Sequence, residues 1–464
     1  MVRNIRLYLS TDTAQPEGRR YAYSMSPAPL RERFMQISRR KLLQSSALLS
    51  AGVFTSASRA ASRLANEQLQ VGFIGVGNHA ASNLVGVAKH AQVAALCDVD
   101  EKYLSLAADV YADAKTFRDL REMLESPQLD AVVISTPDHT HAWPALTAIN
   151  RGLHVFCDKP LTHTSQELEL LVSRAQAKKT ITQTCMQHHV REGTRQAAAI
   201  LQSDILGDVR AIHAWTDRPF WPQGVERPSE VETTPKTLDW DLWLGPAAER
   251  PYSSAYHPLR WRGWYDFGSG ALGDFGPHLL DAIFWGLALP APAKVTPIDM
   301  PQPAKETYPL GTTVKFEFPE TNMRPGFELT WYDGRRLPAR EVTIVDRPPP
   351  NGVMVIGERG KLFVPDYGGT PRLIGFKNEA KLPAPLESPD DVYQDWINAC
   401  RTSGETCLPF SFTAPLMQTC LLGNIAVRTG GDLSWNAAQR KLAPGSAEKY
   451  LQGNYRERWQ LPQL

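Results

Sequence analysis

Short apolar runs alternate with helix-compatible stretches between residues 69 and 190. Four of the runs are apolar enough, and short enough, to be buried strands. They lie at residues 69–74, 93–97, 131–134 and 154–157. Stretches such as residues 143–150 separate them. Short strands that alternate with helices are typical of βαβ units on a parallel sheet, so the pattern predicts an α/β domain over residues 69–190.

The pattern changes after about residue 190, where Gly and Pro separate short β-branched or aromatic runs. These runs lie at residues 209–215, 312–318, 327–331, 342–345, 353–356 and 362–364. Runs of this kind are typical of antiparallel sheets. We therefore expect residues 191–464 to form an α+β domain with a mostly antiparallel open sheet.

The N-terminal region has the features of a targeting segment. The pair Arg39-Arg40 precedes a modest apolar stretch at residues 47–57, which small residues follow. This arrangement resembles a twin-arginine export signal. The apolar stretch is too short, and too interrupted by Ser, Thr and Gly, to span a bilayer. We expect a signal peptide at residues 35–61, an extension or mis-assigned start at residues 1–34, and a periplasmic or otherwise exported mature protein with no membrane span.

Composition narrows the range of partners. The chain has 464 residues, of which 42% are hydrophobic, enough for two ordinary globular domains. Lys and Arg number 50 and Asp and Glu number 49, so no net charge favours nucleic acid or an acidic membrane. The six cysteines form no CxxC pair and no cluster at metal-ligand spacing. We expect neither a nucleic-acid partner nor a metal site.

The first predicted strand leads into a glycine-rich turn. Gly75 and Gly77 allow a tight turn and let a pyrophosphate approach the free amides at the start of a helix, and Asn78 and His79 complete the turn. Asp98 ends the next strand, roughly 20 residues further on, where a carboxylate can hold both ribose hydroxyls. The same carboxylate repels a 2′-phosphate, and no Arg immediately follows it. The motif predicts a Rossmann domain that binds NAD in preference to NADP.

Several further blocks, in the right order, resemble the Gfo/Idh/MocA oxidoreductases, the glucose-fructose oxidoreductase and inositol dehydrogenase type. The blocks are residues 135–141, 158–160, 238–246, 264–281 and 455–459. The resemblance covers essentially all of residues 69–464. It implies that Thr136, Pro137 and His141 lie against the cofactor, together with Asp158 and Lys159. We also expect a homo-oligomer formed through the C-terminal sheet.

Lys159 is the first candidate catalytic residue. A dehydrogenase removes a proton from a hydroxyl while hydride leaves the same carbon, so it needs a base beside the nicotinamide. Lys159 follows a predicted parallel strand, at the end where α/β sheets place their ligands. A positively charged nicotinamide disfavours a second positive charge beside it, which suits a base or proton relay. A surface lysine in a loop is the alternative.

Asp274 and His278 are the other candidates. They are four residues apart, so on a helix they share one face and can reach one substrate hydroxyl together. The resemblance implies that they join Lys159 in the catalytic group, with His278 as acid or base and Asp274 orienting substrate or imidazole. Helix capping is the alternative role for Asp274. Asp281, one turn further on, is a candidate structural partner.

One residue departs from the family pattern, since Asp158 replaces the usual Glu before the lysine. The shorter side chain puts the neighbour's role in doubt. Gln187 and His141 are further candidate neighbours of the cofactor or substrate. The roles of three other histidines, His139, His188 and His189, stay open.

A loop-rich insert between Trp215 and Trp285 holds seven of the twelve tryptophans. The apolar C–H faces of a pyranose lie well on aromatic rings, while its hydroxyls reach Asp and His. Trp264 and Tyr265 are therefore candidate substrate contacts. Core packing is the alternative for each ring.

Three functions fit these features. The first is an NAD-dependent oxidoreductase acting on a hydroxyl of a sugar or polyol, with tightly retained cofactor, because twin-arginine export carries folded proteins to a place where free NAD is scarce. The second is an NAD-dependent glycoside hydrolase working by transient oxidation, elimination, hydration and re-reduction. The third is a non-catalytic exported sugar-binding protein, which the presence of Lys159, Asp274 and His278 together disfavours.

Overall fold

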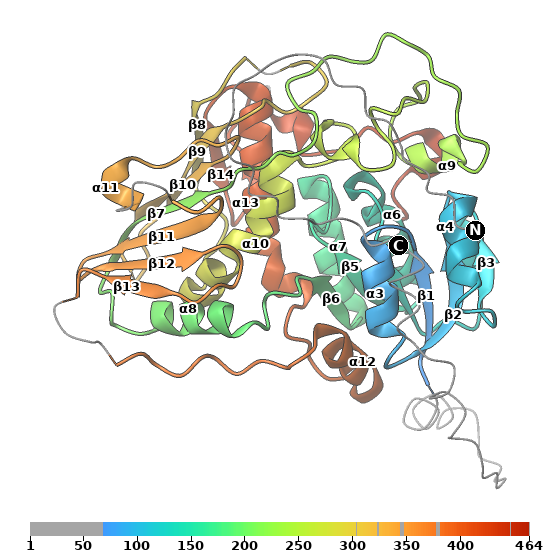
Figure 1. The fold of residues 1–464 in the computed structure, drawn as a ribbon, viewed down its shortest axis with the longest axis horizontal. Coiled ribbons are helices and arrows are strands. Elements are labelled where there is room, and N and C mark those ends of the chain that lie inside the picture. The colour runs from blue at the N-terminus through green and yellow to red at the C-terminus, as the bar shows by residue number, and fades with distance from the viewer. Residues whose placement is uncertain are drawn as a thin grey trace, which may run out of the picture. The chain divides into compact units, whose positions relative to one another are not determined.

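The first part of the described chain is a parallel sheet with helices on both faces (Figure 1). This computed structural model describes residues 68–463 apart from 303, 323, 344–347, 377–380 and 446. The predicted extension and signal peptide, at residues 1–34 and 35–61, lie outside the described residues.

Six strands make up the parallel sheet, in the order β3-β2-β1-β4-β5-β6. They are β1 (Gln70–Ile74), β2 (Gln92–Cys97), β3 (Lys115–Phe117), β4 (Ala131–Ile134), β5 (His154–Asp158) and β6 (Thr182–Cys185). Every neighbouring pair is parallel. This is the Rossmann strand order, in which the direction of winding reverses between β1 and β4 and a crevice opens at the strands' carboxyl ends.

The strands read as continuous apolar runs because helices bury both faces of the sheet. All four residues of β4 have no exposed surface. The helices are α3 (Ala80–Val87), α4 (Glu101–Ala108), α5 (Leu120–Leu124), α6 (Ala142–Asn150) and α7 (Ser165–Lys178). Helix α7 begins at a capping box in which Thr164 and Glu167 bind each other's backbone amides.

The second sheet has nine strands in the order β13-β12-β11-β7-β10-β9-β8-β14-β15. They are β7 (Val209–Trp215), β8 (Lys294–Asp299), β9 (Thr313–Phe318), β10 (Phe327–Tyr332), β11 (Gly352–Gly357), β12 (Lys361–Pro365), β13 (Arg372–Ile374), β14 (Leu433–Asn436) and β15 (Lys441–Leu442). All pairs are antiparallel except β10 with β7. The predicted fold class, a Rossmann domain followed by a mostly antiparallel open sheet, is therefore confirmed.

One expected run does not form a strand. Residues 340–343 form the short helix α11 (Arg340–Thr343), in which the amides of Val342 and Thr343 both bind the carbonyl of Ala339. The prediction of a strand at 342–345 is therefore wrong for its first two residues, because a local helical turn satisfies these amides without a neighbouring strand. Residues 344 and 345 are not described.

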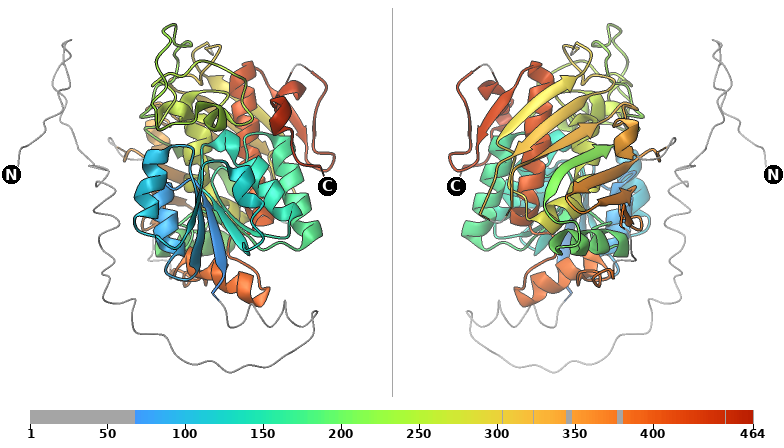
Figure 2. Two further views of the ribbon diagram at one scale, coloured as in Figure 1. Left: turned by 90° about the vertical axis from the view of Figure 1, so that its right-hand side faces the viewer. Right: turned by 90° about the vertical axis from the view of Figure 1, so that its left-hand side faces the viewer.

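Three helices, α8 (Glu192–Gln202), α10 (Gly270–Leu287) and α13 (Phe410–Thr429), pack on one face of the nine-stranded sheet, and α13 also contacts β6 of the first sheet (Figure 1). The opposite face, seen in the right-hand view of Figure 2, carries no long helix among the described residues; the short helix α11 packs Val342 against it. Helices α10 and α13 approach closely at Gly276, where a Cβ atom would lie 2.8 Å from the Cys420 sulfur. A Cβ atom at Gly286 would lie 2.6 Å from Leu201 Cβ in α8, so α10 fits closely against both neighbours.

Helix α13 is also long and apolar enough to cross a membrane, judged by length and composition among the described residues. Most of its apolar stretch is buried within the fold, where it packs against α7, α10 and β8. The expectation of no membrane span stays a prediction.

Segments from the end of the chain return to the parallel sheet. Helix α12 (Val392–Thr402) packs against α3 and β6. Beyond it, the amide of Thr184 in β6 donates to the carbonyl of Leu408 at 2.9 Å, which covers the edge of the sheet. The indole of Trp459 lies edge-on to that of Trp143 in α6, with 5.5 Å between the ring centroids. The first sheet is therefore completed by residues far along the chain, and the expected domain boundary at residue 190 stays a prediction.

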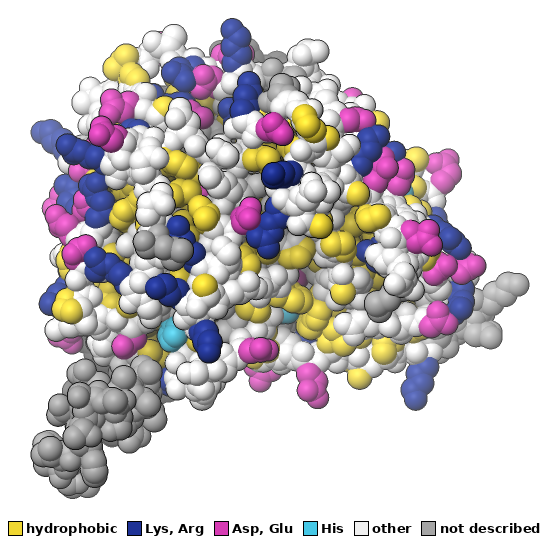
Figure 3. Space-filling model, turned by 180° about the vertical axis from the view of Figure 1, so that it is seen from behind, with side chains coloured by type: hydrophobic (Ala, Val, Ile, Leu, Met, Phe, Trp, Pro, Cys, Tyr) yellow, Lys and Arg dark blue, Asp and Glu magenta, His cyan; other side chains and the backbone are white. Residues whose placement is uncertain are grey.

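Acidic and basic side chains are interspersed on the face seen in Figure 3. This mixture agrees with the balanced composition of 50 basic and 49 acidic residues.

Candidate functional site

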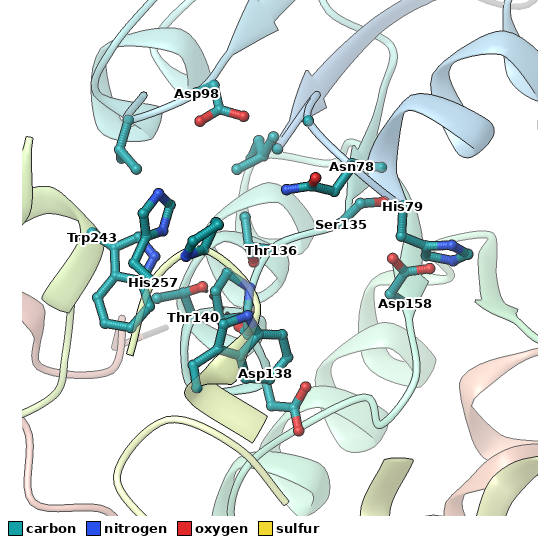
Figure 4. A pocket seen from close by; sticks show the side chains of 18 of the residues that line it. Asn78, His79, Asp98, Ser135, Thr136, Asp138, Thr140, Asp158, Trp243 and His257 are labelled. Carbon is teal, nitrogen blue, oxygen red and sulfur yellow. Dashed lines mark hydrogen bonds between the residues drawn. The ribbon is translucent and has the colours of Figure 1, made fainter. Parts of the chain in front are cut away.

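A pocket opens at the carboxyl ends of β1, β2, β4 and β5 (Figure 4). Its walls come from the loops after these strands, the tryptophan-rich insert, helix α10 and the end of the chain. The side chains that line it include Asn78, His79, Asp98, Tyr103, Arg118, Thr136, Asp138, Asp158, Lys159, Trp243, His257, Trp261, Arg262, Asp274 and Trp459. The pocket lies where α/β sheets of this topology place a ligand.

The glycine turn after β1 is shaped for close backbone approach. Gly75 has a φ of +83°, and a Cβ atom there would lie 2.5 Å from the carbonyl oxygen of Ser135. Helix α3 begins just after the turn, and the His79 side chain makes no capping hydrogen bond to it. The amides of Ala80 and Ser82 donate to the carbonyls of Gly77 and His79, whereas the positive N-terminal end of the α3 dipole still favours a phosphate group beside the turn. Both features fit the pyrophosphate of a dinucleotide.

Asp98 lies at the end of β2 and lines the pocket, as predicted for a ribose ligand. Its Oδ2 accepts from the Val76 amide at 3.0 Å, and its Oδ1 accepts from the Asp100 amide at 2.9 Å. Burial raises the pKa of Asp98 to about 6, although these amides act in the opposite direction. Each oxygen keeps a second lone pair for a ribose hydroxyl.

Arg118 lies in the same wall and was not foreseen from the sequence. Its Nη2 donates to the carbonyl oxygens of Val99 and Thr237, at 3.2 and 3.1 Å. The expected preference for NAD over NADP rests on Asp98 and stays a prediction.

Lys159 and Asp274 meet on the wall of this pocket, although they are 115 residues apart. The Lys159 ammonium donates to Asp274 Oδ1 at 2.9 Å and to the Asp274 carbonyl oxygen at 2.7 Å. Burial alone would raise the pKa of Asp274, but the Lys159 and Arg262 charges outweigh it and lower the pKa to about 2. Asp274 is not a helix cap, because Ser269 occupies that position of α10. Lys159 is not a free surface lysine either, since 14% of its side chain is exposed.

His278 lies one turn beyond Asp274 on α10 and, unlike Lys159 and Asp274, is not among the residues that line the pocket. Its Nδ1 lies 3.0 Å from His188 Nε2, and the two rings meet edge to face. Burial, reinforced by His188 and Lys159, lowers the pKa of His278 well below its usual range. The imidazole is therefore neutral at neutral pH, and its hydrogen bond to His188 is made through Nδ1.

Asp281, the expected structural partner, binds His189 instead of the catalytic candidates. His189 Nδ1 lies 2.9 Å from Asp281 Oδ2, and both side chains are 2% exposed. The His189 ring also stacks on Trp285, with 4.1 Å between centroids. This pair anchors α10 to the loop that carries His188.

The buried side-chain amide of Asn83 binds Asp158, the residue that stands where the family pattern has Glu. Asn83, on the inner face of α3, has no exposed surface. Its Nδ2 donates to Asp158 Oδ1 at 2.9 Å and to Ser135 Oγ at 2.8 Å. Its Oδ1 accepts from the Tyr393 hydroxyl at 2.9 Å and from Gln187 Nε2 at 3.3 Å. Gln187, expected beside the cofactor, is therefore part of the support beneath Asp158 and does not line the pocket.

The pocket end near Asp158 also brings together three candidate metal ligands. His79, Asp158 and Cys185 place ligand atoms within 4.8 Å of one another, and Figure 4 shows His79 and Asp158 side by side. Asn83 already binds the carboxylate and accepts from the Cys185 thiol at 3.3 Å. Burial also raises the pKa of that thiol, so it resists forming the thiolate that binds metals.

His141 holds the cofactor-side loops together from beneath. It is 1% exposed, with Nε2 2.8 Å from the Thr136 carbonyl oxygen and Nδ1 2.8 Å from the Pro160 carbonyl oxygen. Thr136 and Pro137 line the pocket, whereas His141 does not. The expectation that His141 contacts the cofactor is therefore corrected to a positioning role, since both of its ring nitrogens face backbone carbonyls.

The two expected substrate contacts in the insert are not on this pocket. Trp264 is 1% exposed, and its Nε1 donates to the Ala255 carbonyl at 2.9 Å. Tyr265 is 4% exposed and points to a different cavity. The alternative of core packing holds for Trp264, because residues around it form a hydrophobic cluster of their own. The insert contributes Trp243 and Trp261 to the pocket instead.

Several lining residues were missed from the sequence. Asp138 follows the expected contact Pro137, and burial raises its pKa. Arg262 lies near Asp274, with Nε 3.6 Å from Oδ1. Trp459 comes from the end of the chain. Asp138 could have been predicted to line the pocket because it follows Thr136 and Pro137 in the sequence. The positions of Arg262 and Trp459 depend on long-range packing.

Comparison with known proteins agrees with this architecture. Residues 69–185 match a family model described as an oxidoreductase family with an NAD-binding Rossmann fold, and residues 200–320 match the family's C-terminal alpha/beta domain. Inositol 2-dehydrogenase of Salmonella paratyphi B is 27% identical over 150 residues, 31% of this chain and 45% of that enzyme. Levoglucosan dehydrogenase of Pseudarthrobacter phenanthrenivorans is 22% identical, with 40% of each chain covered.

Among solved structures, the WlbA dehydrogenase of Bordetella pertussis, in complex with NADH and UDP-GlcNAcA, has the same fold. The TM-score is 0.56 at 18% identity, and the match covers 80% of this chain and 98% of that one. Fold and pocket thus define a Rossmann-type dinucleotide-binding protein with a second α/β domain. The chain belongs to the Gfo/Idh/MocA oxidoreductase family, and its N-terminal domain is an NAD-binding domain.

Proposed function

We propose that this protein is an NAD-dependent oxidoreductase that acts on a hydroxyl of a sugar or polyol. The observation that carries the proposal is the Lys159–Asp274 pair, which lies in the same pocket as the glycine turn and Asp98. One pocket therefore combines a dinucleotide cradle with groups suited to proton transfer. The relatives named for inositol and levoglucosan support the choice of substrate class.

Asp274, His278 and Lys159 have different roles in the proposed reaction. NAD, when bound, supplies the nicotinamide ring that takes up hydride. Asp274, ionised because its pKa is about 2, accepts a hydrogen bond from the substrate hydroxyl and fixes the Lys159 ammonium. His278 is neutral and can take up the hydroxyl proton at Nε2 when Nδ1 carries the proton shared with His188. Lys159 is the relay between the carboxylate and that imidazole.

Substrate turnover tests this proposal directly. Purified protein is incubated with NAD and myo-inositol, D-glucose or levoglucosan, and NADH is followed by its absorbance. Net NADH that disappears in Lys159→Ala supports the proposal. Release of nitrophenol from nitrophenyl glycosides without net NADH would identify the glycoside hydrolase instead. Sugar binding with neither reaction would identify a non-catalytic binding protein.

We further propose that the protein is exported through its twin-arginine segment and retains NAD tightly. The support is the Arg39-Arg40 sequence together with an NAD-binding domain, since a cofactor bound before export travels inside the folded protein. The test is to purify the mature protein without added nucleotide, denature it, quantify the released NAD and sequence the N-terminus. Near-stoichiometric NAD and a start near Ala61 are expected; an empty site or an intact N-terminus in the cytoplasm contradicts the proposal.

We also propose that two copies associate through the nine-stranded sheet. The support is that the long helices α8, α10 and α13 cover one face only, while among the described residues the other face is covered in part by the short helix α11 (Figure 2). The outer face holds a small apolar cluster around Trp215, Met354 and Phe363. Light scattering of the wild type and of Ile356→Glu, a partly exposed position on the same face of β11, tests this, with a monomeric wild type as the contradicting result.

A further inference from the structure

A second cavity, of about 490 Å³, lies beside the candidate active site. The 3-10 turn Asp138–Thr140 separates the two spaces, because Asp138 and Thr140 line the first pocket and His139 lines the second. The other walls come from the start of α7, from α13, from the turn Glu448–Tyr450 and from residues 452–455. No role in the proposed reaction is assigned to this cavity.

The cavity contains a cation that has no carboxylate partner among the described residues. The Arg428 guanidinium carbon lies 4.6 Å from the ring centre of Tyr265 and 4.5 Å from that of Tyr450. The Lys449 ammonium also lies over the Tyr450 ring, with Nζ 4.9 Å from the ring centre. Like Arg428, it has no ion pair in the part of the chain described. The two aromatic rings fix the Arg428 fork in place without using its N–H donors.

The acidic side chains of the cavity are already bound. Asp266 forms an ion pair with Arg250. Glu167 Oε2 accepts from the amides of His163 and Thr164, both at 2.9 Å, and its Oε1 accepts from the Tyr455 hydroxyl at 2.9 Å. The unsatisfied charge in this cavity is therefore positive.

A second, independent feature also indicates a hydrogen-bond acceptor as ligand. Tyr265 is 4% exposed, and its hydroxyl is buried without a partner among the described residues. Burial raises the pKa of Tyr265 to about 12, so the hydroxyl keeps its proton and can donate. A buried hydroxyl without a partner is costly, and a bound acceptor removes that cost. Tyr308, Asn424 and Gln452 add further polar groups to the same walls.

We propose that this cavity binds a small polyhydroxylated oxyanion, either a sugar acid or a sugar phosphate, with the anionic group on Arg428 and the Tyr265 hydroxyl donating to the same molecule. A planar guanidinium pairs well with carboxylate or phosphate oxygens. The phenol and amide groups of the wall match the ligand's hydroxyls. The proposal concerns binding alone and does not depend on the reaction in the first pocket.

Calorimetric titration of the whole protein tests the proposal with four probes: D-glucuronate, D-glucose 6-phosphate, D-glucose and acetate. At least one of the first two is expected to bind at least about tenfold more tightly than glucose or acetate, since hydrogen bonds to charged groups contribute this much. A preference between the two shows whether carboxylate or phosphate is the natural group.

Matched variants locate the binding. Arg428→Gln and Tyr265→Phe are expected to weaken binding, the former by about tenfold or more. Lys159→Ala and Arg458→Gln, an exposed arginine outside the cavity lining, are expected to leave it unchanged. If Arg428→Gln does not fold, Lys449→Gln changes an exposed side chain and is expected to weaken binding more modestly. No binding of either anion, equal binding of glucose, or loss of binding in Lys159→Ala with Arg428→Gln unaffected would overturn the proposal.

Discussion

The Lys159 ammonium is bound to Asp274 through both a side-chain oxygen, at 2.9 Å, and the main-chain carbonyl oxygen, at 2.7 Å. The second contact does not depend on the identity of the side chain at position 274. The charge of the carboxylate can therefore be removed by substitution while the lysine keeps its main-chain contact, so the two contributions can be measured separately.

Lys159→Ala is expected to lower turnover by about 100-fold or more, as for lost acid-base catalysis. Asp274→Asn keeps the main-chain contact and is expected to reduce turnover less than Lys159→Ala. Steady-state rates with NAD and the preferred substrate measure both effects. NAD affinity is the control and stays near the wild-type value; near-normal turnover of Lys159→Ala removes the lysine from the mechanism.

The Asp98 carboxylate predicts a pH dependence of NAD binding. Its pKa is raised to about 6 mainly by burial, and only the ionised form offers both oxygens as acceptors to the ribose. Affinity is therefore highest above this pKa and falls as pH drops through about 6, approaching tenfold per pH unit. Fluorescence titrations at several pH values measure the effect.

Two substitutions at position 98 are the controls for this dependence. Asp98→Asn is expected to bind NAD weakly but with no such pH dependence. Asp98→Ala is expected to relax discrimination against NADP, because the repulsion of a 2′-phosphate is lost. Unchanged affinity for both cofactors in Asp98→Ala shows that the ribose is bound elsewhere.

The His188–His278 contact predicts different effects of two substitutions. His278→Ala removes the proposed proton acceptor, and turnover is expected to drop by about 100-fold or more. His188→Gln keeps a polar side chain next to His278 Nδ1 and is expected to shift the pH profile of kcat with a smaller loss of rate. Equal losses in the two variants, with unaltered pH profiles, would mean a structural role for both rings.

Asn83 is predicted to be a stability determinant of the cofactor pocket. Asn83→Ala leaves Asp158, Ser135 and Tyr393 without a shared buried partner, and we expect the free energy of unfolding to fall by about 2 kcal/mol or more. Tyr393→Phe removes one of these hydrogen bonds and is the matched control, with an expected loss of about 1 kcal/mol. Chemical denaturation measures both, and a larger loss in Tyr393→Phe than in Asn83→Ala contradicts the prediction.

His139 predicts acid sensitivity of the fold. Its pKa is lowered to about 3 by burial, from a usual 6.5, so the unfolded chain binds a proton that the folded chain does not. Above pH 6.5 the imidazole is neutral in both states, and the free energy of unfolding does not depend on its protonation. As pH falls from 6.5 toward 3, His139 lowers the free energy of unfolding by about 1.4 kcal/mol per pH unit. Asp98 and Asp333, whose pKa values are raised to about 6, act in the opposite direction.

The change in slope, measured by denaturation between pH 6.5 and 4, isolates the histidine. His139→Gln is expected to lower the slope of the unfolding free energy against pH by up to about 1.4 kcal/mol per pH unit relative to the wild type, because the opposing contributions of Asp98 and Asp333 remain in both proteins. The same slope in variant and wild type would show that His139 does not control acid stability.

The parallel sheet and its glycine turn were predictable because their signals are local. Buried parallel strands are continuous apolar runs, and Gly75 and Asp98 occupy fixed positions relative to those strands. The pairing of Lys159 with Asp274 spans 115 residues, so the resemblance to a family suggested it and periodicity did not.

The rest of the pocket depends on packing that a local pattern does not encode. Trp243 and Trp264 belong to the same aromatic insert and the same hydrophobic cluster, yet only Trp243 reaches the pocket wall. Asn83 reads as an ordinary polar residue of a helix, and its partners lie between 52 and 310 residues away. Gln187 and His141 are candidate neighbours of the cofactor or substrate by sequence, whereas in the structure both bind other protein groups.

The return of the chain's last segments to the first sheet has a consequence for biosynthesis. A ribosome delivers the N-terminal residues first, and domains generally fold as they emerge. Here, the edge of β6 is covered by Leu408, and the pocket wall includes Trp459, so the nucleotide-binding half stays unfinished until these residues have been synthesised. Nascent chains halted before residue 459 would lack part of that wall. Completion of the dinucleotide pocket is thereby tied to synthesis of a residue more than 300 positions beyond the parallel strands' first half.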